Sequence, residues 1–205
     1  MGVRGWIVLV LCVSMSWCMV VDNFDVYSGG LIVSDTISPK TNTNFVTANS
    51  SNIIGNERDL GLTVCSNIGE YVYMANVGGG YCSFGASYVP STGYLKAQWD
   101  GEDASLTLNP SGLGELDFSS YSSFNISMRS TRTVATLALY VYSGSVNEFC
   151  SSNVTIPRGF NSLYNVHIPF STFSHGCDFA QVGAIEAIFS TQGLTYIITD
   201  GLSVF

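Results

Sequence analysis

The stretch VATLALYVY, residues 134–142, decides the fold class because its side chains alternate in character with a period of two. Successive side chains of a β-strand point to opposite faces of its sheet. One face of this strand is aliphatic and is predicted to enter a core; it carries Leu137, Leu139 and Val141. The other face carries Tyr140 and Tyr142, which fit either a second packed layer or a ligand surface. Tyr71 and Tyr73 repeat this same-face pattern in another run.

Similar runs, rich in β-branched and aromatic residues, follow one another along the chain with turn residues between them. They occupy residues 20–27, 31–34, 59–65, 71–77, 81–89, 94–99, 105–108, 123–129, 154–157, 164–169, 182–189 and 194–205. The run 182–189 contains helix-forming residues, but Gly183 and Thr191 beside its isoleucines favour a strand. Residues 34–53 are polar and irregular, and predict a long surface loop. A strand spacing of about ten residues is typical of an all-β sandwich or barrel.

Charge is scarce in this chain. Only 11% of its 205 residues are charged, and 15 acidic residues against 7 basic ones give a net charge of −8. Nucleic-acid binding needs a basic surface, so we expect no nucleic-acid partner. A hydrophobic fraction of 46% argues against disorder. The surface must owe its polarity to Ser, Thr, Asn and Gly, which suits neutral ligands better than charged ones.

Residues 1–18 have the pattern of a cleaved secretory signal peptide. Arg4 supplies a short positive region, and an apolar stretch at residues 6–13 follows it. Cleavage after Cys18 or, alternatively, after Ser16 fits the small residues there; an uncleaved anchor is a third interpretation, although the apolar stretch is short for a span. We therefore expect a secreted, extracellular protein of one domain, residues 19–205, with no membrane span and a net charge of −9 once Arg4 is removed.

Four cysteines remain after cleavage, and an even number in a secreted chain indicates disulfides. They are Cys65, Cys82, Cys150 and Cys177. Of the three possible pairings we favour Cys65–Cys82 with Cys150–Cys177, because each pair lies in one local block of strands. Buried free thiols are the alternative. A zinc site is disfavoured, since no CxxC spacing occurs and only His167 and His175 could contribute.

Three sequons, at Asn49, Asn125 and Asn153, would carry glycans if the chain passes through a eukaryotic secretory pathway.

A family resemblance rests on the order of several short motifs. These are VDNF at 21–24, GNERDL at 55–60, LDFSSYSSF at 116–124, IPFSTF at 168–173, VGAI at 182–185 and DGL at 200–202. In this order they resemble galactose-binding-like jelly rolls, which include carbohydrate-binding modules and secreted bacterial proteins with a C-terminal sorting signal. No such signal follows Phe205. The resemblance implies a jelly-roll β-sandwich of two antiparallel sheets, but jelly rolls host many unrelated activities.

The resemblance also implies a possible structural calcium, because end strands of these jelly rolls often hold one. Asp22, Asp25 and Asp200 lie near the two ends of the chain, and their carboxylate oxygens suit that ion. Ordinary exposed strand-end acids are the competing interpretation. In the Glu57-Arg58-Asp59 segment we expect a structural ion pair, with a buried Arg58 held by the two acids beside it.

The segment WDGED at 99–103 is the most concentrated polar group in the sequence. A sugar site combines an aromatic ring, which covers the apolar face of a pyranose, with carboxylates that accept from its hydroxyls. Trp99 with Asp100, Glu102 and Asp103 could form such a site, and the tyrosine pairs could extend it. The alternative is a hairpin turn in which Trp99 is a core residue and the acids are solvated.

No enzyme signature is present: the sequence contains no GxSxG, HExxH or P-loop. We expect a non-catalytic carbohydrate-binding or cell-surface recognition protein whose partners are neutral glycans. A structural or adhesive protein that contacts extracellular matrix is one alternative. A small glycan-active enzyme is another, since two of the 15 acids could pair as a glycosidase does.

Overall fold

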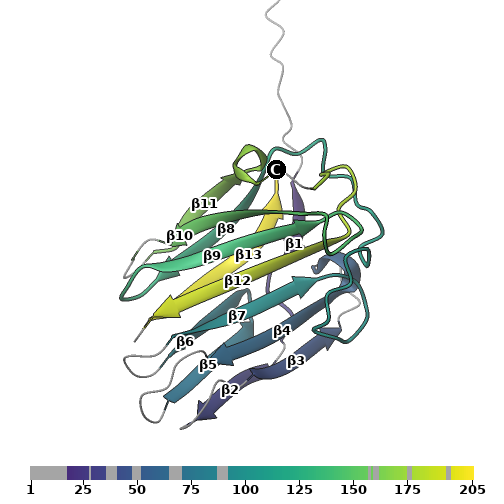
Figure 1. Ribbon diagram of the computed structural model, residues 1–205. Helices are drawn as coiled ribbons and strands as arrows, with labels where there is room; N and C mark the ends of the chain where they lie inside the picture. Colours follow the sequence, from purple (N-terminus) through teal and green to yellow (C-terminus); the bar gives the residue numbers. More distant parts are fainter. Residues whose placement is uncertain are drawn as a thin grey trace, which may run out of the picture.

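The chain folds as a jelly-roll β-sandwich of two antiparallel sheets, seen in a computed structural model (Figure 1). The structure describes residues 18–27, 29–35, 41–47, 52–64, 71–86, 92–156, 158, 162–174, 177–192 and 195–205. For some of these, Tyr71 and Tyr73 among them, the backbone alone is described. The predicted signal segment therefore lies almost entirely outside the described residues, as do Asn49 and Cys65.

The back sheet of Figure 1 has seven strands in the order β11-β8-β13-β6-β5-β2, with β1 paired to β13. Its strands are β1 (Met19–Asp22), β2 (Gly29–Asp35), β5 (Tyr71–Gly78), β6 (Tyr81–Ala86), β8 (Ser123–Ser130), β11 (Tyr164–Pro169) and β13 (Tyr196–Val204). The first and last strands therefore lie side by side, with Met19 opposite Val204.

The front sheet has six strands in the order β10-β9-β12-β7-β4-β3. Its strands are β3 (Thr41–Thr47), β4 (Glu57–Val64), β7 (Thr92–Trp99), β9 (Ala135–Tyr142), β10 (Phe149–Ile156) and β12 (Ala184–Gln192). The predicted strand at 134–142 is confirmed as β9, and the strand interpretation of 182–189 is confirmed by β12. Two short 3-10 helices, η1 (Ile54–Asn56) and η2 (Phe170–Thr172), complete the described elements.

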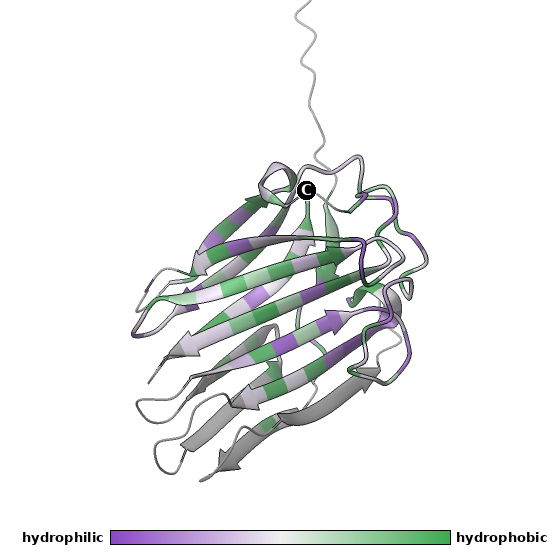
Figure 2. Ribbon diagram, in the orientation of Figure 1, coloured by the Kyte–Doolittle hydropathy of each residue, from purple (hydrophilic) through white to green (hydrophobic). Residues whose placement is uncertain are grey.

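The core lies between the sheets, and it is built by the alternation that the sequence predicts. Leu137, Leu139 and Val141 of β9 are fully buried there. They pack with inward residues of the neighbouring strand β12, such as Ile185 and Phe189. Figure 2 shows the same alternation of apolar and polar residues along the strands of the front sheet. Burial of this apolar surface is the main stabilising contribution of such a sandwich.

Two predicted segments differ from the structure. Residues 34–53 are not one long loop, because β3 forms within them at the edge of the front sheet. Alternate threonines there favour an extended strand. Residues 105–108, predicted as a strand, belong instead to a long connection between β7 and β8. The Ser105 hydroxyl accepts a hydrogen bond from the Thr107 amide, so local side-chain bonds replace a sheet partner there.

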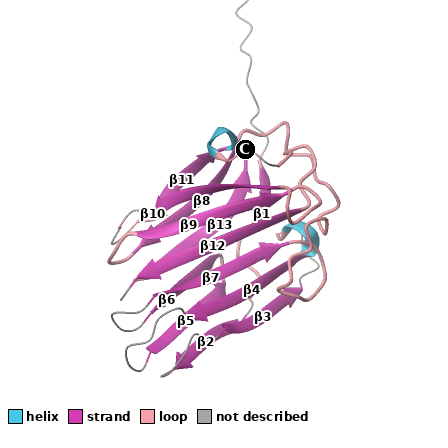
Figure 3. Cartoon of the chain, in the orientation of Figure 1, coloured by secondary structure: helices cyan, strands magenta, loops and turns pink. Residues whose placement is uncertain are grey.

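The β7–β8 connection, residues 100–122, lies at one end of the sandwich, where Figure 3 shows most of the loops. Two glycines lie very close to backbone carbonyl groups of this connection. A Cβ added at Gly112 would lie 1.5 Å from the carbonyl oxygen of Asp100, and one added at Gly183 would lie 2.0 Å from that of Pro110. Only glycine fits such contacts. The connection is therefore a defined part of the fold, packed against the start of β12.

One predicted disulfide is confirmed and the other is not. Cys150 of β10 is bonded to Cys177, whose Cα lies 5.1 Å away. Cys82 is instead a free, buried thiol, so the predicted Cys65–Cys82 bond is wrong for this cysteine. Cys82 lies on β6 in register with Val77 and Thr199, and its side chain belongs to the apolar core between the sheets.

Candidate functional site

Trp99 is a core residue and not part of a ligand surface. Its side chain is fully buried, and its indole Nε1 donates a hydrogen bond to Asp22 Oδ2 at 3.0 Å. The sugar platform predicted around Trp99 is therefore wrong. Strand alternation explains this, because Trp99 is in register with Ile185 of β12, which also points into the core.

Arg58 is buried and ion-paired as predicted, but its partner is different. Arg58 Nη1 lies 2.6 Å from Asp22 Oδ2, Nη2 donates to the Val26 carbonyl at 2.9 Å, and the guanidinium stands 5.3 Å from the centre of the Phe24 ring. The expected partners, Glu57 and Asp59, precede and follow Arg58 on the strand and so point to the opposite face.

The three acids predicted to bind calcium do not form one site. Asp22 is fully buried, and both of its carboxylate oxygens accept hydrogen bonds: Oδ1 from the Phe24 amide, Oδ2 from Arg58 and Trp99. Burial raises the pKa of Asp22, and these three donors oppose that rise. Asp25 is exposed and accepts from Asn23, whereas Asp200 is exposed on β13. Among the described residues, the acids that do gather are others, as shown below.

The outer face of the front sheet carries the two predicted tyrosines. Tyr142 is mostly buried and Tyr140 partly exposed, and both contact Phe149 on the edge strand β10, with ring centres 5.7 and 6.0 Å from its ring. Phe149 itself is 40% exposed. Tyr140 and Tyr142 thus lie outside the core, in an aromatic cluster that ends at the solvent. The side chains of Tyr71 and Tyr73 are outside the description.

Polar groups lie beside this aromatic cluster in the same sheet row. Glu186 of β12 is in register with Tyr140 on one side and Gln98 on the other. Glu186 Oε2 accepts from Gln98 Nε2 at 2.9 Å and lies 3.5 Å from Lys96 Nζ. Burial raises the pKa of Glu186, while Lys96 and Gln98 oppose the rise, and its charge acts in turn on Tyr142. An aromatic ring, a carboxylate, an amide and an ammonium group therefore lie next to one another on this face of the sheet.

Further along the same face, a shallow hollow of about 480 Å³ is lined by Tyr94, Thr136, Ser190 and their neighbours. Ser190 is in register with both Tyr94 and Thr136. From Glu186 to Ser190 is four residues, about 13 Å along the strand. We call the outward residues Tyr94, Lys96, Thr136, Tyr140, Phe149, Glu186 and Ser190 the tyrosine face.

Asp103 of the WDGED segment lies close to two acids of β4, Glu57 and Asp59. Glu57 and Asp59 point outward from β4 and are buried under the β7–β8 connection. Glu57 Oε1 accepts from the amides of Asp103 and Ala104 at 3.0 and 2.7 Å. Carboxylate oxygens of Glu57, Asp59 and Asp103 all lie within 4.8 Å of one another. We call these three residues the acidic cluster.

Two buried acids at this place have strongly raised pKa values. Burial, reinforced by the charges of Glu57, Asp100 and Asp103, raises the pKa of Asp59 to about 8. Burial raises that of Asp100 to about 6, although its Oδ2 accepts from the Asn109 amide. Glu102, in contrast, is exposed. Asp59 and Glu57 are too deeply buried to meet a sugar directly, so a glycosidase pair is not formed here.

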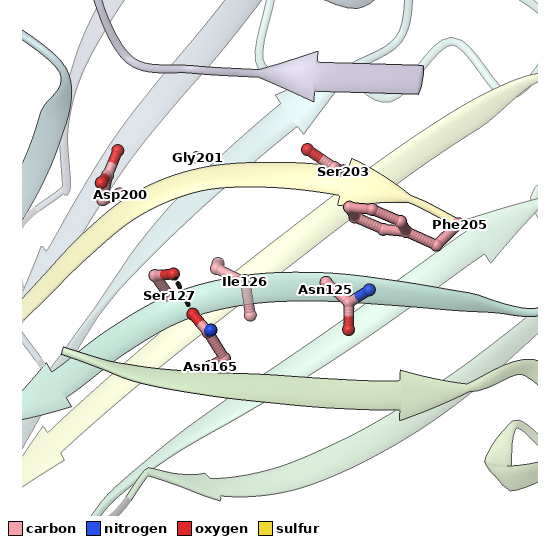
Figure 4. Close-up of a pocket in the computed structure, with 8 residues that line it drawn as sticks. All are labelled: Asn125, Ile126, Ser127, Asn165, Asp200, Gly201, Ser203 and Phe205. Carbon is pink, nitrogen blue, oxygen red and sulfur yellow. Dashed lines mark hydrogen bonds between the residues drawn. The ribbon is translucent and has the colours of Figure 1, made fainter. Parts of the chain in front are cut away.

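A third feature is a polar hollow of about 350 Å³ on the outer face of the back sheet (Figure 4). Asn125, Ser127, Asn165 and Asp200 line it, with Ser127 Oγ donating to Asn165 Oδ1 at 2.5 Å. Asn125 Oδ1 lies 2.9 Å from His167 Nδ1. Asn125 is the acceptor of a predicted sequon, so a glycan attached to it would start at this hollow. Asn153 is exposed on β10. Modification of either stays a prediction.

Sequence reasoning missed Tyr94, Lys96 and Glu186 as surface residues of one face. The signal was present in the strand period: Tyr94, Lys96 and Gln98 alternate with Leu95, Ala97 and Trp99. What the sequence lacked was the strand order that places β7, β12 and β9 side by side.

Comparisons with known proteins give a likeness in structure alone. No family model and no curated protein matches the sequence. Among solved structures, the CtCBM11 solution structure is similar with 14% identity and a TM-score of 0.49, over 94% of this chain and 97% of that chain. A family 11 carbohydrate-binding module from Clostridium thermocellum, solved with a β-1,3-1,4-mixed-linked tetrasaccharide, is 14% identical with a TM-score of 0.46, over 92% of this chain and 95% of that one.

A family 30 carbohydrate-binding module of the cellulosomal cellulase Cel9D-Cel44B from Clostridium thermocellum is 10% identical, with a TM-score of 0.46 over 92% of this chain and 97% of that chain. Such identities and scores say nothing about what this chain binds. Among the described residues, no helix has the length and hydrophobicity that a membrane span requires.

Proposed function

We propose that this protein is a secreted, non-catalytic carbohydrate-binding protein that holds a neutral oligosaccharide on the tyrosine face. One observation carries the proposal: Tyr140 and Glu186 lie side by side on an outward sheet face, between the exposed ring of Phe149 and Lys96. Aromatic rings cover the apolar faces of sugar rings, and charged or amide groups bond their hydroxyls.

The size and charge of the tyrosine face support a neutral, extended ligand. Tyr140 and Tyr94 lie two strands apart, on β9 and β7. They are about 10 Å apart across the sheet and about 13 Å along it. Glu186 and Lys96 balance each other at 3.5 Å, so the face has no strong charge of either sign. An extended, uncharged ligand with many hydroxyls matches these features better than an anion or a single small molecule.

A glycan array with the purified chain tests the proposal, followed by calorimetry with the best ligand. Tyr140→Ala should weaken binding about tenfold, because a stacked ring contributes about 0.5–1.5 kcal/mol beyond its buried area. Tyr164→Ala is the matched control, since Tyr164 is 44% exposed on β11 in the back sheet. A folded chain that binds no neutral glycan, or equal losses in both variants, would contradict the proposal.

Two further measurements address catalysis and export. The bound oligosaccharide should be recovered intact after long incubation, because the tyrosine face as defined carries a single carboxylate, that of Glu186; turnover would favour the enzyme interpretation. Mass spectrometry of protein from the culture medium should give an N-terminus at residue 19, and retention of residues 1–18 would contradict secretion by cleavage.

A further inference from the structure

The acidic cluster lies between β4 and the β7–β8 connection. Glu57 and Asp59 share the outward face of β4, since they are two residues apart on a strand. The connection folds over this face: the amides of Asp103 and Ala104 bond Glu57, and the Leu106 side chain lies against Gly61. Asp103 thereby brings a third carboxylate to within 4.8 Å of the other two.

Asp59 is the unusual member of the cluster. Its side chain is fully buried, and neither of its carboxylate oxygens has a hydrogen-bond partner. Two further buried oxygens beside it are also unpartnered: Oε1 of Gln98, which is in register with Asp59, and Oδ1 of Asp100. Buried polar groups in folded proteins are almost always bonded, and buried charges are paired or coordinate metals.

Among the described residues, the two basic side chains of β4 and β7 are engaged mainly with other groups. Arg58 points to the opposite face of β4, where it pairs with Asp22. Lys96, the nearest cation on β7, bonds Glu186 and the Leu106 carbonyl. The place therefore offers oxygen acceptors of high negative charge and few donors, which is the chemistry of a hard-cation site.

We propose that Glu57, Asp59 and Asp103 bind a calcium ion that fastens the β7–β8 connection to β4. Calcium takes oxygen ligands at 2.3–2.6 Å, so two ligand oxygens around it stand up to about 5 Å apart. The 4.8 Å limit of the acidic cluster agrees with this spacing. Magnesium binds at 2.0–2.1 Å and keeps several waters, which suits a buried group of three carboxylates less well.

The proposed ion would connect the acidic cluster with the tyrosine face. Lys96 donates to the Leu106 carbonyl at 3.4 Å, and Lys96 is also the ion-pair partner of Glu186. A connection fixed on β4 therefore fixes one partner of Lys96. The site is separate from Asp25 and Asp200, and from Asp22, which is committed to Arg58.

The test uses the full secreted chain after treatment with a chelator, with thermal unfolding and calorimetry as readouts. Calcium at about 100 times its dissociation constant should raise the melting temperature by about 5–10 °C, and magnesium at the same concentration should raise it much less. Asp103→Asn, on the exposed connection, should abolish the calcium response while the chain still folds. Asp59→Asn should also abolish it. Glu102→Gln, an exposed acid of the same segment, should keep it.

The outcomes separate clearly. A calcium response in the parent chain and Glu102→Gln, lost in both aspartate variants, supports the site. No heat of binding and no calcium shift in the parent chain overturns it, and would mean that the acids share a proton. A response that survives Asp103→Asn and Asp59→Asn would place the ion elsewhere and also overturn it. Glycan binding is measured separately, so its absence does not affect this result.

Discussion

Replacement of Arg58 by methionine tests the buried cluster of Asp22, Arg58 and Trp99. Methionine keeps most of the side-chain volume, so the change removes the charge and leaves only a small cavity. Asp22 would keep two donors, the Phe24 amide at 2.7 Å and the Trp99 indole at 3.0 Å, and lose the guanidinium at 2.6 Å. An uncompensated buried charge costs about 3–5 kcal/mol. For a domain of this size this lowers the melting temperature by about 6–20 °C.

Urea unfolding followed by tryptophan fluorescence is the assay, because Trp99 is the one tryptophan after residue 18 and its indole belongs to the cluster. The double variant Asp22→Asn with Arg58→Met is the control. It removes both charges and should recover much of the loss, since an ion pair as a whole need not stabilise a fold. A single variant within about 1 kcal/mol of the parent, or strictly additive losses in the double variant, would refute the reasoning.

Three more predictions follow from single contacts. Replacement of Cys150 and Cys177 by alanine should lower the unfolding free energy by about 3.5 kcal/mol, the loop-closure contribution of a bond across 27 residues; an unchanged urea midpoint would contradict it. Gly112→Ala should reduce the yield of folded protein or lower its melting temperature sharply, because the new Cβ would lie 1.5 Å from a backbone oxygen; a parent-like melting curve would contradict it. Glu186 has a raised pKa in the folded state, so the stability it contributes is present at low pH and lost as the pH rises above about 4.5. The free energy of unfolding of Glu186→Gln, measured by urea titration, should therefore increase relative to that of the parent as the pH rises from 4 to 7. The opposite trend would show that the pairing of Glu186 with Lys96 dominates.

The sequence predicts the fold class well because strand alternation is a local signal. Leu137, Leu139 and Val141 need only a period of two to be placed in the core, and the structure places them there. The edge strand β3 is missed, because an edge strand with one polar face looks like a loop. The prediction for residues 105–108 is wrong in the opposite sense, because a strand is predicted where a loop is found. There the Thr107 amide bonds the Ser105 hydroxyl and not a neighbouring strand.

The candidate sites depend on which residues distant in sequence become neighbours. Asp22 and Arg58 are 36 residues apart, and nothing local pairs them. Trp99 resembles a sugar platform in sequence because acids follow it, yet its own position in the strand period directs it inward. The acidic cluster joins β4 to a connection more than 40 residues later. These contacts between residues distant in sequence follow from the order of the strands in each sheet, which cannot be read from composition or from residue spacing.

The position of the last two strands has a consequence for how the chain is made. β12 lies between β9 and β7, and β13 lies between β8 and β6, so each is a central strand of its sheet. Neither sheet can form completely before residues 184–204, which make up β12 and β13, have been synthesised. Until then, the apolar faces of the earlier strands stay unpaired, and folding with so many non-local contacts is slow. We therefore expect the chain to be prone to aggregation until β12 and β13 have taken their places in the two sheets.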